Sequence, residues 1–289
     1  MSTLDQFIKG IYEFVEIQLP RLEGGPWVRE LEGKIIRLEE SPRDLNCLVA
    51  VDSGFSEITY AGARLGLINV VGMEFRSRER RSLLSPIVLG KSMELPVEAR
   101  AAEFEVATQL MESRRDCLVL LDGTIKLSTP SERYIRAKSM LLSTARSSNA
   151  IVLAHSKDVT INRYTELDTD ERMPLFVAME KNRAVDKYNG VLITAPLILD
   201  ELSIFYVQYK PHLLPIYVES INPPDLSPLT TISKLVTGEG YPIPLYIVDR
   251  LSKLGNETIK YMKLSIAKLA RGYGALAIHE TLREMLNKN

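Results

Sequence analysis

The sequence predicts an α/β protein in which a mixed β-sheet is flanked by helices. Short apolar runs with the length of buried strands alternate along the chain with longer segments of helical periodicity. Two of these runs, residues 48–51 and 117–121, end directly at an aspartate. No internal repeat and no low-complexity linker interrupts the 289 residues. One mixed α/β domain over residues 1–289 is therefore the simplest interpretation.

The first elements follow from local patterns. Apolar residues at helical spacing over 3–18 predict an amphipathic N-terminal helix. The run 48–51 predicts a short strand, after which Gly54 is expected to let the chain change direction. A second, longer strand is predicted over 65–75. The charged run 76–81 is expected to form an exposed turn or a strand end.

Helices and buried strands alternate in the central part. Residues 97–113 place apolar side chains on one helical face, and residues 117–121 predict a strand that is covered on both faces. Thr129 is the candidate N-cap of a helix over about 130–146, because proline and glutamate follow at positions favoured in a first turn. Residues 150–154 predict the next buried strand.

The last third predicts strands followed by helices. Three strands are expected within 190–219. Pro242 and Pro244 fit the first turn of a helix, and Gly255 is expected to end it. Asn256 is a good N-cap for one more helix, which would reach about residue 270.

Composition limits the kinds of partner and compartment. Lys+Arg 36 and Asp+Glu 37 leave a net charge near zero, so a nucleic-acid surface must come from local clusters of basic residues. No apolar stretch approaches the roughly 20 residues of a membrane span, and the first ten residues lack a signal-peptide core. We expect a soluble, cytoplasmic protein with no membrane contact, in which Cys47 and Cys117 are buried thiols rather than a disulfide.

The sequence lacks several familiar catalytic motifs. It contains no phosphate-binding loop and no paired CxxC, HExxH or GxSxG motif. Its three histidines do not favour a histidine-rich metal site. Carboxylates therefore remain as the candidate ligands.

Asp52 and Asp122 each end an apolar strand, and Glu105 lies on the helix before the second of these strands. Like charges brought together there would repel one another unless divalent cations bind. Hard ions such as Mg²⁺ or Mn²⁺ prefer oxygen ligands, and two ions about 4 Å apart would support phosphodiester cleavage. Each signal is weak by itself, since aspartate is common in turns, and spacing does not choose Glu105 over Glu103.

The order of the elements carries more information than any one of them. A strand with an aspartate is followed by a hairpin, a helix with a glutamate, a second strand with an aspartate, and finally a helix with an acid. This order resembles the ribonuclease H-like fold, in which the metal ligands come from those elements. A fold does not fix function, so an RNA-directed hydrolase is compatible with the same order.

Four segments make the resemblance more specific: residues 51–55 (VDSGF), 100–110 (RAAEFEVATQL), 119–124 (VLLDGT) and 240–245 (GYPIPL). They resemble the successive signature segments of the NurA nucleases, over a core of about residues 45–255. NurA proteins are archaeal and bacterial nucleases that process DNA ends, usually as manganese-dependent homodimers with the hexameric translocase HerA. The resemblance implies a nuclease for single-stranded DNA and DNA ends, a 5′–3′ exonuclease with some endonuclease activity, in end resection and repair.

The resemblance also implies roles for individual residues. Asp52, Glu105 and Asp122 correspond to the metal-binding carboxylates, with Glu105 selected by its place in the second segment. Tyr241 matches an active-site tyrosine, and Lys157 is a candidate phosphate contact. Mn²⁺ or Mg²⁺, as two ions, would be the cofactor.

One position departs from the family pattern. Eight residues after Tyr241 the family commonly has histidine, whereas this chain has Asp249. Many ribonuclease H-like enzymes take a fourth ligand from an aspartate on the last helix, so we interpret Asp249 as a retained metal ligand. The alternative is a catalytically weak paralogue that binds DNA or the translocase as a scaffold.

Basic residues of the charged run offer a path for DNA. Phosphate contacts need only positive charge at suitable spacing, which Arg78, Arg80 and Arg81 supply. A solvated charged surface explains the same residues equally well.

Overall fold

The computed structural model describes residues 26–40, 45–60, 63–90, 93–129, 131–157, 162–165, 170–221 and 225–269. The chain divides into two compact units: unit 1 comprises Met1–Leu45 and Ile151–Ile243, and unit 2 comprises Asn46–Ala150 and Pro244–Asn289. The helix expected over 3–18 lies outside the described residues. Among the described helices, none is long and apolar enough to cross a membrane. A single NurA-like domain over residues 1–289 stays a prediction.

The strands of unit 2 are β2 (Cys47–Tyr60), β3 (Ala63–Glu74), β4 (Arg80–Leu89) and β5 (Cys117–Asp122). They lie in the order β5-β2-β3-β4; β2–β3 and β3–β4 are antiparallel, and β2–β5 is parallel. An antiparallel meander with a parallel strand beside its first member is the ribonuclease H-like arrangement. The predicted fold class, a mixed sheet flanked by helices, is confirmed.

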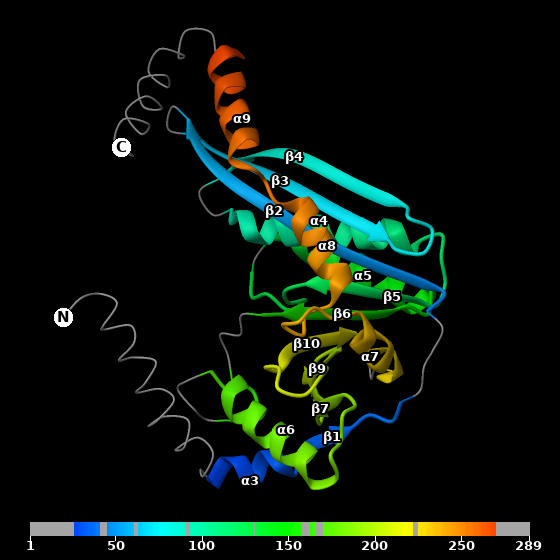
Figure 1. The fold of residues 1–289 in the computed structure, drawn as a ribbon. Helices are drawn as coiled ribbons and strands as arrows, with labels where there is room; N and C mark the ends of the chain where they lie inside the picture. The colour runs from blue at the N-terminus through cyan, green and yellow to red at the C-terminus, as the bar shows by residue number, and fades with distance from the viewer. Residues whose placement is uncertain are drawn as a thin grey trace, which may run out of the picture. The chain divides into compact units, whose positions relative to one another are not determined.

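The helices of unit 2 are α4 (Leu95–Met111), α5 (Glu132–Ser147), α8 (Ile243–Ser252) and α9 (Asn256–Leu269). α4 lies on one face of β2 and β3, and α8 crosses the other face (Figure 1). α5 packs against α4. Because α4 lies between strands and another helix, it buries side chains all around its axis rather than on the single face that its apolar pattern predicts.

Two glycines allow the helices to approach the strands closely. A Cβ at Gly72 on β3 would lie 2.6 Å from the Val106 side chain of α4. A Cβ at Gly54 on β2 would overlap the backbone carbonyl of Ser252, at the end of α8. The predicted change of direction at Gly54 is wrong, because β2 continues to Tyr60. Glycine is needed there for the close approach of α8.

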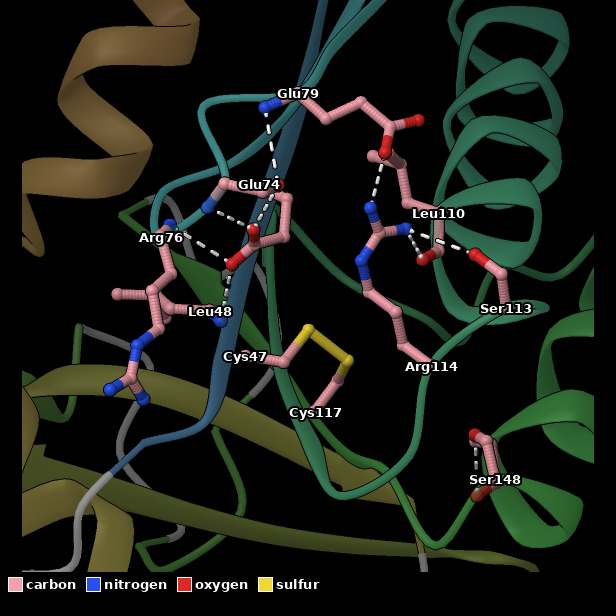
Figure 2. Close-up of a disulfide and its surroundings, with 12 residues drawn as sticks. Cys47, Leu48, Glu74, Arg76, Glu79, Leu110, Ser113, Arg114, Cys117 and Ser148 are labelled. Carbon is pink, nitrogen blue, oxygen red and sulfur yellow. Dashed lines mark hydrogen bonds and ion pairs between the residues drawn. A yellow bond between two sulfur atoms is a disulfide. The ribbon is translucent and has the colours of Figure 1, made fainter.

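Cys47 and Cys117 form a disulfide (Figure 2). The prediction that they are free thiols is wrong. Both cysteines are buried, as expected, but they are directly paired residues of β2 and β5, with their Cα atoms 4.5 Å apart. That distance lies within the range that a disulfide spans, and a strand register of this kind cannot be obtained from the sequence.

Unit 1 is built on antiparallel strands. Their order is β1 (Ile35–Arg37), β7 (Leu192–Thr194), β9 (Leu202–Gln208), β10 (Ile216–Ile221) and β6 (Ile151–Ser156), with β8 (Leu197–Leu199) paired to β9. Its helices are α3 (Pro26–Glu32), α6 (Arg172–Asp186), α7 (Ser227–Ile232) and the short 3-10 helix η2 (Ser233–Leu235). Tyr206 packs edge-on against Tyr164 and Tyr217 in the core.

Several element boundaries differ from the predictions. The sequence predicts no helix at α6 and, at β4, only an exposed turn or strand end over 76–81; β4 is largely exposed and begins with two arginines. Ser131, rather than Thr129, caps α5 by accepting a hydrogen bond from the backbone N–H of Tyr134. α8 ends at Ser252, before Gly255.

Candidate metal centre

Two strands of unit 2 carry an aspartate to the same place. Val51 and Leu121 are the last paired residues of the parallel β2–β5 ladder, and Asp52 and Asp122 follow them. Asp249 reaches the same point from α8, so that one carboxylate oxygen of each aspartate lies within 4.8 Å of the others. The structure therefore brings together the three aspartates that the sequence predicts as ligands.

Hydrogen bonds hold the end of α8 beside β2. The hydroxyl of Ser252 donates to Oδ2 of Asp52 at 2.9 Å. The side-chain amide of Asn69 on β3 donates to the backbone carbonyl of Ser252 at 2.8 Å. Lys253 Nζ forms an ion pair of 2.7 Å with Oδ2 of Asp249. These contacts place the carboxylate of Asp249 against the two strand aspartates.

A hollow of about 280 Å³ adjoins Asp52 and Asp122, and the acid that α4 contributes to it is Glu103. Glu103 accepts hydrogen bonds from the hydroxyl of Ser53 and from the guanidinium of Arg100. Arg100 also donates to the backbone carbonyl of Asp122. A single arginine thus connects the helical acid to the strand end that carries an aspartate.

Glu105 points to a different neighbour. Its two carboxylate oxygens accept hydrogen bonds of 2.9 and 2.8 Å from Arg133 on α5. Residues two apart on a helix are about 200° apart around its axis, so Glu103 and Glu105 cannot face the same hollow. The structure does not bring Glu105 to the aspartates, and Glu103 stands where the sequence interpretation placed Glu105.

Burial and mutual repulsion favour protonation of these acids. Burial raises the pKa of Asp52 to about 6, and the neighbouring charge of Asp122 adds to the rise. Burial also raises the pKa of Glu103 to about 8, although the nearby Arg100 opposes that rise. Oxygen ligands that repel one another in this way are suited to hard divalent cations.

Comparison with known proteins identifies the family. The NurA domain model matches residues 48–254, which is most of the chain. The chain belongs to the NurA family. Among proteins with curated descriptions, none matches the sequence.

Solved NurA structures share the fold at low sequence identity. The NurA nuclease from Sulfolobus solfataricus is 14% identical, with 94% of this chain and 99% of that chain covered and a TM-score of 0.62. A second NurA crystal structure is 9% identical, covering 96% of this chain and 100% of that chain, with a TM-score of 0.66. A NurA bound to dAMP and manganese is 11% identical, covering 95% and 100%, with a TM-score of 0.59. At these identities the likeness shows the fold, and family membership supports a nuclease.

Two other candidate residues of this NurA-family chain meet in unit 1. Lys157 follows β6, and its Nζ lies 3.8 Å from the centre of the Tyr241 ring. Tyr241 is buried, and its backbone N–H donates to the hydroxyl of Thr237 at 3.2 Å. The cation–π contact holds the ammonium group of an exposed lysine over the tyrosine face.

The arginines predicted to contact DNA lie apart from the aspartates. Arg80 and Arg81 are exposed on β4, two strands away from β2, and Arg78 is exposed in the turn before β4. The guanidinium of Arg81 pairs with Glu79 at 3.2 Å. None of the three lines the hollow beside Asp52.

Sequence reasoning missed two residues of the site, Arg100 and Ser252, and it selected Glu105 over Glu103 from the family resemblance. Arg100 and Glu103 lie three residues apart in the RAAEFEVA segment, a spacing that places them on one helical side and could have indicated their pairing. Gly123, directly after Asp122, has a φ of 90°, and a Cβ there would overlap the guanidinium of Arg100. Glycine is therefore needed after Asp122 for its positive φ and for the space that the guanidinium of Arg100 occupies.

Proposed function

We propose that this NurA-family chain is a divalent-metal-dependent nuclease that hydrolyses DNA phosphodiester bonds. The observation that carries the proposal is the meeting of Asp52, Asp122 and Asp249 within 4.8 Å. NurA structures solved with manganese, and with dAMP and manganese, support the same reading for this chain.

The donor set fits Mn²⁺ or Mg²⁺. It consists of carboxylate oxygens, which hard ions prefer. Burial disfavours the negative charge of Asp52, and a bound cation would stabilise that charge. Asp52, Asp122 and Asp249 would hold the metal, with Glu103 as a further ligand and two ions as the expected content. When bound, the metal supplies an activated water and stabilises charge on the phosphate oxygens.

The remaining residues of the hollow orient these ligands. Arg100 donates hydrogen bonds to Glu103 and to the backbone carbonyl of Asp122. It also lines the hollow, and its positive charge is proposed to contact a phosphate there. Phe55 is 45% exposed at the edge of the hollow, where a base of single-stranded DNA can stack on its ring. Lys157 is proposed as a phosphate contact beside Tyr241.

The finer assignments come from the family resemblance. They are 5′–3′ exonuclease action on single strands and DNA ends, some endonuclease action, and a role in DNA end resection and repair in the cytoplasm. The proposed partners are DNA, a second copy of the chain as a homodimer, and a HerA-type hexameric translocase. Arg78, Arg80 and Arg81 remain proposed contacts to the DNA backbone.

One observation favours a second candidate function, that of a catalytically weak scaffold. Asp249 stands where the family commonly has histidine, and its carboxylate is paired with Lys253 at 2.7 Å. Asp249→Ala should lose most activity if Asp249 is a ligand, whereas Asp249→His should keep some activity and shift its preference toward Mn²⁺. Inert wild-type protein, with cleavage restored by Asp249→His, would establish the scaffold function.

The direct test is cleavage of end-labelled nucleic acid. Wild-type protein is incubated with single-stranded DNA or RNA in the presence of Mn²⁺, Mg²⁺ or a chelator. We expect DNA cleavage with metal and none with chelator, and Glu112→Gln, a change on the exposed end of α4, should match wild type. Metal-independent cleavage, or cleavage of RNA alone, would contradict the proposal.

A further inference from the structure

The disulfide joins the two strands that carry the candidate ligands. It connects Cys47 to Cys117, the first residue pair of the parallel β2–β5 ladder. Asp52 and Asp122 each follow five residues after their cysteine. Because the spacing is equal on both strands, the bond lies in the same register that places the two aspartates beside each other.

The ladder between β2 and β5 is short. It has five residue pairs, from Cys47–Cys117 to Val51–Leu121, whereas β2 and β3 pair over twelve. Parallel pairing is also slightly less stable per residue than antiparallel pairing. A slip of one residue along β5 would turn the side chain of Asp122 to the other face of the sheet.

The disulfide does not reach the metal centre by direct contact. Successive side chains of a strand point to opposite faces, so Cys47 and Asp52, five residues apart, do not share a face. The same five residues span about 16 Å along the strand. The influence of the bond on Asp52 therefore passes through the backbone.

The start of β2 is already held on its other side. The backbone N–H of Leu48 donates to Oε1 of Glu74 at 3.2 Å, and the N–H of Phe75 donates to the carbonyl of Leu48 at 2.9 Å. Figure 2 shows the hydrogen bond between Leu48 and Glu74 and, close to it, the disulfide. β2 is thus fixed to the end of β3, and the disulfide ties β5 to β2 at the first residue pair of their ladder.

We propose that the Cys47–Cys117 disulfide is a positioning element of the metal centre, which locks the register of β5 on β2. The inference rests on the proposed function, because it gives the bond a role in metal binding and not in stability alone.

The test begins with the bond itself and continues with metal binding. Thiol titration of the unfolded, unreduced chain should find no free thiol, and two free thiols would overturn the proposal. Calorimetric titration with Mn²⁺ alone, without DNA, then compares wild type with Cys47→Ala/Cys117→Ala. We expect about 10-fold weaker binding or more in the variant, the effect typical of losing support for a ligand. The control is Leu141→Ala, a buried change on α5 that lowers stability and should keep wild-type affinity.

The outcomes separate this proposal from the proposed function. Equal Mn²⁺ affinity in wild type and the double variant would overturn the register lock alone, whereas wild-type protein that binds no Mn²⁺ would overturn both. Cys47→Ala alone also removes the bond, with a smaller loss of core volume. It replaces the double variant in the Mn²⁺ titration if the double variant does not fold. In the folded variant, hydrogen exchange should be faster in β5 while β2–β3 keeps its protection; unchanged exchange in β5 would also overturn the proposal.

Discussion

Glu171 in unit 1 and Asp52 in unit 2 are both buried acids, but their surroundings differ. Glu171 accepts hydrogen bonds from the three consecutive backbone N–H groups of residues 163–165. Asp52 accepts hydrogen bonds from Ser252 and from the backbone of Ser53, and its pKa is raised by burial and by the neighbouring carboxylates. The hydrogen bonds to Glu171 compensate for the burial of its carboxylate and so stabilise the fold. The arrangement at Asp52 leaves negative charge that a cation can neutralise.

Asp52→Asn should give the largest functional effect in this comparison. We expect Mn²⁺-dependent cleavage to fall by about 100-fold or more, because losing a ligand costs more than the 10–100-fold typical of residues that support ligands. The metal-free fold should be kept or slightly stabilised, since one repelling charge is removed. Single-turnover cleavage and thermal unfolding measure the two effects.

Glu171→Gln is the contrasting variant. It should lower the free energy of unfolding by about 1–3 kcal/mol, because buried N–H groups lose a charged acceptor. Activity per folded molecule should stay at the wild-type level. If Asp52→Asn lost stability and kept cleavage, the distinction between the two buried acids would be wrong.

Glu103→Gln and Glu105→Gln decide which helical acid serves the site. We expect Glu103→Gln to reduce cleavage by about 10–100-fold and to raise the Mn²⁺ concentration for half-maximal rate. Glu105→Gln should lose only the partly exposed ion pair with Arg133, a cost of about 1 kcal/mol or less. A larger catalytic loss in Glu105→Gln would restore the assignment made from the sequence.

Gly54→Ala should disturb the site through α8. The added Cβ would overlap the carbonyl of Ser252, so α8 has to shift and carry Asp249 away from the strand aspartates. We expect a loss of about 1–3 kcal/mol in stability and about 10-fold weaker Mn²⁺ binding. Gly255→Ala is the matched control, because a Cβ there meets no atom within 4 Å. Equal Mn²⁺ affinity in both variants would show that α8 contributes no ligand.

The sequence located Asp52 and Asp122 because a buried strand that ends at an acid leaves a clear pattern. The helical acid was harder to choose. α4 is buried against strands on one side and against α5 on another, so its sequence has no polar stripe from which to assign faces. The sequence allows either Glu103 or Glu105 as the helical ligand. Their hydrogen-bond partners in the structure, Ser53 for Glu103 and Arg133 for Glu105, distinguish the two.

Contacts between distant segments account for the other differences. Glycine is common in turns, but Gly54 is needed because the carbonyl of Ser252 packs against it. Ser252 lies almost two hundred residues further along the chain. The pairing of Cys47 with Cys117 depends on the register of two strands, which local composition does not specify. Local patterns thus predicted most elements, and tertiary packing decided which side chains complete the site.

Burial and mutual repulsion destabilise the charged acids of the metal centre, and a bound cation is expected to relieve both effects. Thermal unfolding of wild-type protein with and without Mn²⁺, at about pH 7 and about pH 8.5, tests this expectation most directly. Burial, with a smaller contribution from the charges of Asp52 and Asp122, raises the pKa of Glu103 from 4.5 to about 8. Its contribution to stability is therefore complete below pH 4.5 and is lost as pH rises through 8. The metal-free Tm should therefore fall between the two pH values, Glu103→Gln should remove that fall, and Mn²⁺ should raise the wild-type Tm most at the higher pH. A Tm that changes with neither pH nor Mn²⁺ would show that the acids are not destabilised by their charge and do not bind the cation.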